Sequence, residues 1–504
     1  MPRRGDIINK TVKTVALVTI FSCIERFIGF IYRIFLSRNV DSELIGVYQV
    51  TLSVIGVLVT LSASGIPITV SRLMMKERAL NDKKGEKEVV AAGILSSLLL
   101  SLPVTFLLYF FRDKFSFIFA DQRCYDLLII ILPGVIITSV YAVIRGYFWG
   151  NENFFTYSLI ELLEEIVMAI LGVILVKTAA SGWQKARGIS CAVLLSYVFS
   201  FLTSTSVFIT KSGKIANPIK KLKPLIKSSS PITAMRTLTS FLSSLVAVIL
   251  PNQLIASGVN KSVAMASYGE LSGMALPLLF IPSTVIGSIA LVVAPKLSGS
   301  YYKKDNDSLN FAVRKSFDYS LLVATLIIPI FISCGLEIGK IIYDNENAGG
   351  YLATSAFIML PMSLTMISNS LLNSLNQEKT TLLNFIIGAA AMILPVLFLT
   401  KFFGVYSLIL GYLLSYALTG GLNFLKLSKI TREGKIYLKK TALFFTSLAL
   451  STLLGCFLKR IIANIAADFL TLIIITAATL IFNGIFLQIV GAVDIKNFFK
   501  SFSR

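Results

Sequence analysis

The chain has 504 residues, of which 55% are hydrophobic and only 14% are charged, and its mean hydropathy is +0.79. Soluble proteins carry about 25% charged residues, so this composition excludes an ordinary soluble domain and predicts an all-α polytopic membrane protein. Histidine is absent, the five cysteines lack ligand spacing, and no phosphate-binding or dinucleotide glycine motif occurs, so we predict no enzyme, no metal site and no cofactor.

Apolar runs long enough to cross a bilayer recur along the whole chain. We predict about fourteen transmembrane helices from their length. Their expected ranges are 14–37, 43–71, 88–111, 124–144, 154–176, 188–210, 228–255, 265–295, 316–336, 350–374, 380–400, 404–425, 441–458 and 464–492.

The first of these ranges carries charges well inside its length, at Glu25, Arg26 and Arg33. One charge at mid-bilayer costs about 2.5–3.5 kcal/mol on insertion scales. Arg26 and Arg33 are two helical turns apart and so share a side of the helix. Gly29 lies between them and leaves room for a neighbouring helix or a ligand. We therefore expect this face to meet water, a carboxylate or an anionic substrate.

The net charge of +21 resides mainly in the loops. In a soluble protein it would suggest nucleic acid; here the alternation of basic and less basic loops predicts a plasma-membrane protein with both termini in the cytoplasm and anionic membrane lipids as partners, with no nucleic acid. The N-terminal segment is basic, but the following span is too long and too charged for a cleaved signal peptide, and we expect it to be retained.

A basic, proline-containing loop, residues 211–227, separates two groups of six predicted helices. Each group begins and ends on the same side of the membrane, so we predict two parallel six-helix repeats with a substrate cleft between them. The likeness of GNENFFTYSLIELL (150–163) to LNQEKTTLLNFIIG (375–388) supports this repeat. The predicted domains are residues 1–210, the loop 211–227, residues 228–427, and an additional helix pair with a cytoplasmic tail at 428–504.

The fifth predicted helix carries three glutamates on one face, Glu161, Glu164 and Glu165. Three carboxylates on one face repel one another unless some are paired or protonated. Glu161 fits a solvated position near the inner surface. Glu164 and Glu165 lie deeper, where they either pair with arginines or act as a coupling site that binds a cation.

The seventh and eighth predicted helices supply a third arginine and a candidate hinge. Arg236 would join Arg26 and Arg33 in the cleft, because the first and seventh helices correspond in the repeat. Ion pairing with Glu25, Glu164 or Glu270 is the alternative to an anion site. The eighth helix contains Gly269, Pro277 and Pro282, which predict either tolerated bends or a hinge for alternating access.

Several blocks resemble a known family, the stage V sporulation protein B group. They are ERFIGFIYRIFLSRNVDSELIGVYQV (25–50), SPITAMRTLTSFLSSLVAVILPNQLIASGV (230–259), YGELSGMALPLLFIPS (268–283) and RGYFWG (145–150). This group is similar to the polysaccharide and lipid-linked-oligosaccharide flippases of the multidrug/oligosaccharidyl-lipid/polysaccharide exporter superfamily. The resemblance implies a role in peptidoglycan, particularly the spore cortex. Resemblance to its lipid II branch implies pyrophosphate contacts at Arg26 and Arg33, which here lie one residue further apart than is usual in that branch.

Together these features predict a flippase for an undecaprenyl-pyrophosphate-linked cell-wall precursor, with pyrophosphate on Arg26, Arg33 and Arg236. Two alternatives stay open. One is a cation-coupled exporter of drugs or metabolites that uses Glu164. The other is a non-transporting membrane scaffold for cell-wall synthesis proteins.

Overall fold

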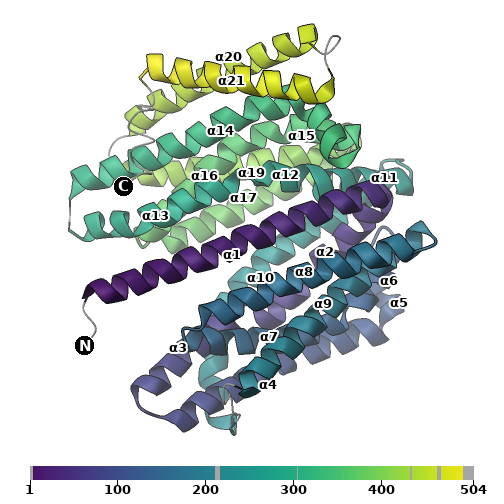
Figure 1. Ribbon diagram of the computed structural model, residues 1–504, viewed down its shortest axis with the longest axis vertical. Helices are drawn as coiled ribbons and strands as arrows, with labels where there is room; N and C mark the ends of the chain where they lie inside the picture. Colours follow the sequence, from purple (N-terminus) through teal and green to yellow (C-terminus); the bar gives the residue numbers. More distant parts are fainter. Residues whose placement is uncertain (1–3, 211–215, 304, 432–433, 463–466, 492–504) are drawn as a thin grey trace. The chain divides into compact units, whose positions relative to one another are not determined.

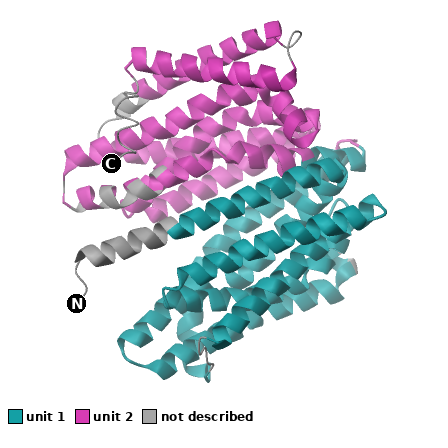
Figure 2. Cartoon of the chain, in the orientation of Figure 1, with its two compact units in different colours: residues 1–255, 260–269 teal, residues 256–259, 270–504 magenta. Residues whose placement is uncertain are grey.

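The computed structural model describes residues 4–210, 216–303, 305–431, 434–462 and 467–491, and every regular element in these ranges is helical (Figure 1). The predicted all-α polytopic fold is therefore confirmed. The chain forms two compact units (Figure 2). The first contains residues up to Ile255 together with Asn260–Gly269, and the second contains Ala256–Val259 and the chain from Glu270 onward.

The first unit begins with a long helix that carries the charged face predicted above. Its helices are α1 (Arg4–Asn39), α2 (Ser42–Ala63), α3 (Ile66–Ala79), α4 (Lys83–Phe110), α5 (Arg112–Phe115), the 3-10 turn η1 (Ser116–Ile118), α6 (Gln122–Ile131), α7 (Pro133–Gly150), α8 (Phe154–Thr178), α9 (Gly182–Thr210), α10 (Ile219–Ala256) and α11 (Lys261–Gly269).

Small residues set the close packing of this unit. A Cβ placed on Gly146 of α7 would lie 2.7 Å from the carbonyl oxygen of Pro67 in α3, and one on Gly93 of α4 would lie 2.7 Å from Val143 of α7. Backbones can approach this closely only where a side chain is missing. The apolar core beside these contacts includes Val70 and Phe148.

The second unit begins with several consecutive helical segments in place of the single eighth helix predicted over 265–295. Its elements are the π-helix η2 (Glu270–Ala275), α12 (Leu276–Phe280), α13 (Ser283–Tyr302), α14 (Asn306–Tyr343), α15 (Glu346–Ser355), the 3-10 turn η3 (Ala356–Ile358), α16 (Met359–Ser374), α17 (Glu378–Phe398), α18 (Thr400–Phe403), α19 (Tyr406–Thr431), α20 (Gly434–Ile462) and α21 (Asp468–Ile489). One core cluster joins α13, α14, α16 and α19 around Phe317 and Ile367.

Eleven helices among the described residues are long and apolar enough to cross a membrane, or twelve if the pair α6–α7, bent by 43°, forms one span. Neither α1 nor α8 is among them. Both are long, but α1 carries Glu25, Arg26 and Arg33, and α8 carries three glutamates. The chain is thus a multi-pass membrane protein, while the number fourteen stays a prediction.

The two segments that resemble each other in sequence form the same turn. Between α7 and α8, Glu152 has φ +55°, and between α16 and α17, Asn376 has φ +59°. In both turns an amide nitrogen donates to the carbonyl oxygen five residues earlier, from Asn153 to Phe148 at 2.9 Å and from Gln377 to Leu372 at 3.0 Å. The local repeat thus extends from sequence to backbone conformation.

The compact units do not divide at the predicted loop. Helix α10 already begins at Ile219, inside the predicted loop 211–227, and both α10 and α11 pack with the first unit. The assignment of these helices to a C-terminal six-helix repeat stays a prediction, because packing and repeat boundaries need not coincide.

Candidate functional site

The first unit contains a half-open polar cavity of about 190 Å³ among α1, α2, α7, α8 and α9. One water needs roughly 10–15 Å³ of such volume, so the cavity is large enough for several waters or a small ligand group. Its polar lining consists of Glu25, Thr138, Tyr141, Arg145, Glu161, Glu164, Glu165 and Tyr197. Four carboxylates and one guanidinium give the lining a strongly acidic character.

Two glycine contacts bring the glutamates of α1 and α8 together. A Cβ on Gly29 of α1 would lie 2.7 Å from the Oε1 atom of Glu165, so this glycine admits the carboxylate of α8. A Cβ on Gly172 of α8 would lie 1.9 Å from the hydroxyl of Tyr32, which is buried on α1. The helical spacing of the three α8 glutamates then turns all of them toward Glu25.

Arg145 is the cation that the structure places in this cavity. Its Nη1 atom lies 3.4 Å from Glu161, and its guanidinium carbon lies 5.5 Å and 5.9 Å from the ring centroids of Trp149 and Tyr157. Such stacking on aromatic faces stabilises a guanidinium. The Nε atom of Arg145 and the hydroxyl of Tyr141 are buried without a hydrogen-bond partner among the described residues. Both are polar groups that a ligand or water in the cavity would satisfy.

From the sequence, Glu161 is expected to be a solvated acid, and Arg145 is named within the family-like block RGYFWG (145–150). Tyr141 and Tyr197 carry no predicted role. The available signal was the aromatic content of RGYFWG next to an arginine, because aromatic rings flanking a cation favour a stacked, partly buried position.

The three predicted arginines do not line this cavity. Arg26, Arg33 and Arg236 all belong to the first unit and are exposed on its surface. Arg236 donates from Nη1 to the carbonyl oxygen of Ser64 at 3.3 Å. Neither Arg26 nor Arg33 forms an ion pair with another described residue. Arg26 follows Glu25 by one residue, about 100° around the helix, which explains why the glutamate faces the cavity and the arginine does not.

Glu270 belongs to the second unit. Its carboxylate is 6% exposed and accepts from the Nδ2 atoms of Asn345 and Asn347 at 3.1 Å and 3.5 Å. Amides rather than an arginine therefore satisfy this acid.

The predicted hinge residues mark the interruptions of the eighth helix. Pro277 lies in the first turn of α12, and Pro282 directly precedes α13. Gly269 ends α11, where its missing side chain admits α2, since a Cβ there would lie 2.3 Å from the carbonyl oxygen of Ser42. That these helical segments act as a hinge during function stays a prediction.

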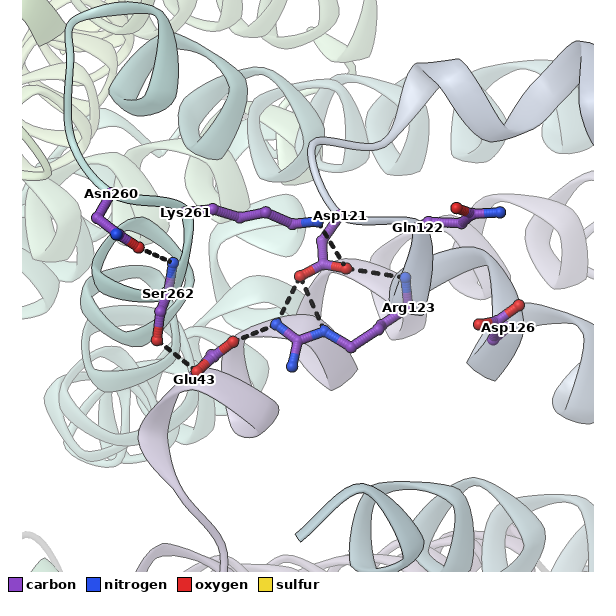
Figure 3. Close-up of a pocket in the computed structure, with 8 residues that line it drawn as sticks. All are labelled: Glu43, Asp121, Gln122, Arg123, Asp126, Asn260, Lys261 and Ser262. Atoms are coloured by element: carbon purple, nitrogen blue, oxygen red, sulfur yellow. Dashed lines mark hydrogen bonds and ion pairs between the residues drawn. The ribbon is translucent and has the colours of Figure 1, made fainter.

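A second, open pocket of about 480 Å³ is lined by an ion-pair cluster at the N-terminal ends of α2, α6 and α11 (Figure 3). Arg123 donates to Asp121 from Nη2 at 2.7 Å and from Nε at 3.0 Å, and it also pairs with Glu43. Lys261 lies 3.3 Å from Asp121. Acids at helix N-termini complement the helix dipoles, so we assign this cluster a structural role.

Asp121 is the buried centre of that cluster, with 1% of its side chain exposed. Burial by itself would raise the pKa of Asp121, but the hydrogen bonds and charge of Arg123, with the charge of Lys261, outweigh it and hold the pKa below its ordinary value. Among the described residues, no three carboxylate or cysteine side chains are arranged to bind one metal ion.

Comparisons with known proteins place these features in context. A family model described as polysaccharide biosynthesis protein matches residues 11–300. Stage V sporulation protein B of Bacillus subtilis (strain 168) is 24% identical over 378 residues, which cover 73% of each chain.

Two solved structures share the fold. The lipid II flippase MurJ in an inward closed conformation superposes with a TM-score of 0.72 at 17% identity, covering 94% of this chain and 99% of that one. An inward-facing multidrug resistance MATE family transporter of the MOP superfamily gives 0.68 at 15% identity, covering 84% and 99%.

Proposed function

Because this chain belongs to the polysaccharide biosynthesis protein family, we propose that it is a flippase for an undecaprenyl-pyrophosphate-linked peptidoglycan precursor. The match to a lipid II flippase over 94% of the chain is the observation that carries this proposal. The similarity to a stage V sporulation protein favours a precursor of the spore cortex. No bond is made or broken in this function, so the chain is proposed to be a transporter and not an enzyme.

The proposed mechanism moves the polar head group across the membrane by alternating access while the lipid tail stays in the bilayer. A pyrophosphate would be repelled by the four glutamates of the cavity. We therefore propose that the pyrophosphate binds to the exposed arginines of α1, Arg26 and Arg33, with Arg236 as a third contact. An inside-negative membrane potential favours the outward transfer of negative charge by about 2.3 kcal/mol per charge per 100 mV.

The test of this function uses proteoliposomes loaded with a fluorescent polyprenyl-pyrophosphate saccharide and an external enzyme that modifies only exposed head groups. Replacing both Arg26 and Arg33 by alanine is expected to lower the flipping rate at least tenfold, because two charge-assisted contacts to phosphate are lost. Arg187→Ala, an exposed arginine of α9, is the matched control and should flip at the wild-type rate. An unchanged rate in the double variant would reject the arginine site, and no flipping by the wild-type protein would reject the function.

The acidic cavity favours a second candidate function, cation-coupled export. Glu25, Glu161, Glu164 and Glu165 surround a space that accepts a cation more readily than an anion. The fold shared with a multidrug transporter is compatible with it. In this case the double change Glu164→Gln and Glu165→Gln abolishes the sodium or pH dependence of transport. A flippase driven by membrane potential alone keeps its rate in that variant.

A further inference from the structure

The last two helices of the second unit, α20 and α21, lie along α14 (Figure 1). Helix α20 runs parallel to α14. Along their shared contacts, the residue numbers of both helices rise in the same direction. The contacts that show this are two ion pairs and the row of small and polar side chains between them.

The two ion pairs join α20 to α14 at a constant offset. Lys440 lies 2.6 Å from Asp318, and Lys459 lies 2.9 Å from Glu337, each pair being 122 residues apart in sequence. The acids are almost buried, with 6% and 11% of their side chains exposed. From Asp318 to Glu337 the helix rises about 28 Å at 1.5 Å per residue, which is close to the thickness of the hydrocarbon core, about 30 Å. The pairs thus bracket the whole membrane-embedded length of the contact.

Polar contacts also fill the stretch between the ion pairs. Asn483 of α21 accepts from Ser447 of α20 at 2.7 Å and donates to the carbonyl oxygen of Thr325 in α14 at 3.3 Å. One amide therefore ties all three helices together. Within the hydrocarbon no water is present to replace such hydrogen bonds if the helices separate.

The remaining contact is a close approach through a glycine. A Cβ on Gly455 of α20 would lie 2.3 Å from the hydroxyl oxygen of Ser333 in α14, and the neighbouring Cys456 has its Sγ atom 3.9 Å from that oxygen. This close approach lies about one helical turn from the Lys459–Glu337 pair, and the Asn483 contacts lie between it and the Lys440–Asp318 pair, so specific contacts follow one another along the seam.

We propose that α20 and α21 form a sheath that stays docked on α14 throughout transport, so that the lipid tail of the substrate does not pass between α14 and α20. The second clause rests on the proposed flippase function. Opening this seam would break the two ion pairs at the ends of the hydrocarbon core and leave the amide of Asn483 without its partners inside the bilayer, which is costly. The sheath thus moves with α14 as one body, and the lipid tail enters elsewhere.

A disulfide across the seam tests this proposal. In Ser333→Cys, the new thiol faces the native Cys456, and oxidation is expected to link α14 to α20, as detected by mass spectrometry of the linked peptides. The oxidised variant should flip lipid at the rate of the reduced variant. The wild-type chain treated with the same oxidant is the matched control. Loss of flipping on oxidation with recovery on reduction would overturn the proposal, as would failure of the two cysteines to link.

A charge reversal separates failure of the sheath from failure of the proposed function. Asp318→Lys and Lys440→Asp are each expected to lower the melting temperature of the detergent-purified protein, and the double variant should recover most of that loss. This readout requires no substrate. A double variant no more stable than the single ones would show that the ion pair does not hold the sheath. If instead stability recovers but the wild-type protein flips no lipid, the sheath stands and the flippase function fails.

Discussion

At the scale of single residues, two aromatic rings hold in place the guanidinium of Arg145, the cation of the acidic cavity. Arg145 has only a 3.4 Å contact to Glu161 but lies over both Trp149 and Tyr157. A guanidinium placed in this way neutralises part of the acidic lining without being locked to one carboxylate. In the part of the chain that the structure describes, its Nε atom has no hydrogen-bond partner, so this edge of the guanidinium can donate to a ligand or water in the cavity.

Asp121 gives a pH-dependent prediction at this scale. Its pKa is lowered in the folded protein, so its stabilising effect is fully present above the ordinary value of 3.8 and is lost as the pH falls toward the folded-state pKa. Asp121→Asn should therefore lower the free energy of unfolding at neutral pH by about 1.5–3 kcal/mol, the worth of hydrogen bonds to charged groups. Thermal melts of both proteins between pH 7 and pH 3 would measure the difference, which should shrink at the acid end.

The control for this experiment is Asp305→Asn, since Asp305 also accepts from a helix N-terminal amide but is exposed. Its effect should be small at every pH. A stability difference for Asp121→Asn that does not depend on pH would contradict the assigned ion pairing.

At the scale of elements, helix pairs in this protein meet where a side chain is missing. Helix α1 approaches α8 through Gly29 and Gly172, while α2 approaches α11 through Gly46 and Gly269. The two glycine contacts differ in how well they would tolerate an added Cβ atom. At Gly29 the neighbouring atom ends a flexible glutamate side chain, whereas at Gly46 it belongs to the backbone of Met265.

Gly46→Ala is therefore expected to be strongly destabilising. The added Cβ would lie 1.9 Å from the carbonyl oxygen of Met265, and backbone cannot move aside as a side chain does, so overpacking should cost about 1–3 kcal/mol. Gly421→Ala in α19, where no atom of the described residues lies within 4 Å of the added Cβ, should be neutral or slightly stabilising because alanine favours helix. Melting temperatures in detergent would compare them, and equal values for both variants would refute the α2–α11 contact.

At the scale of the whole molecule, the acidic cavity lies entirely within the first unit, and the sheathed helix α14 lies entirely within the second. Each unit therefore carries its own polar feature inside a largely apolar helical frame. Buried polar groups within a membrane are expensive and generally mark function or a specific helix contact. We interpret the glutamate cavity as a mark of function, and the seam of α14 with α20 and α21 as a specific helix contact.

The orientation of the chain in the membrane is a prediction at this largest scale. With cytoplasmic termini, Lys223 near the start of α10 faces the cytoplasm, and Lys177 near the end of α8 faces the outside. Both are exposed. A membrane-impermeant maleimide should label Lys177→Cys in intact cells, and it should label Lys223→Cys only after permeabilisation, in each case above the labelling of the parent chain. The reverse pattern would invert the topology.

The protein class, the approximate positions of the helices and the family resemblance are all readable from the amino-acid sequence. Long apolar runs have few stable conformations in a bilayer other than helices, so composition and spacing sufficed. The likeness of residues 150–163 to 375–388 is also visible in the sequence, and the turns at Glu152 and Asn376 share their backbone conformation. Which charged side chains meet one another depends on how the helices pack. Glu25 and Arg26 are adjacent in sequence yet face different surroundings, and Arg145 joins glutamates of another helix. Helical rotation and packing between distant segments fix such meetings, and no local pattern encodes them.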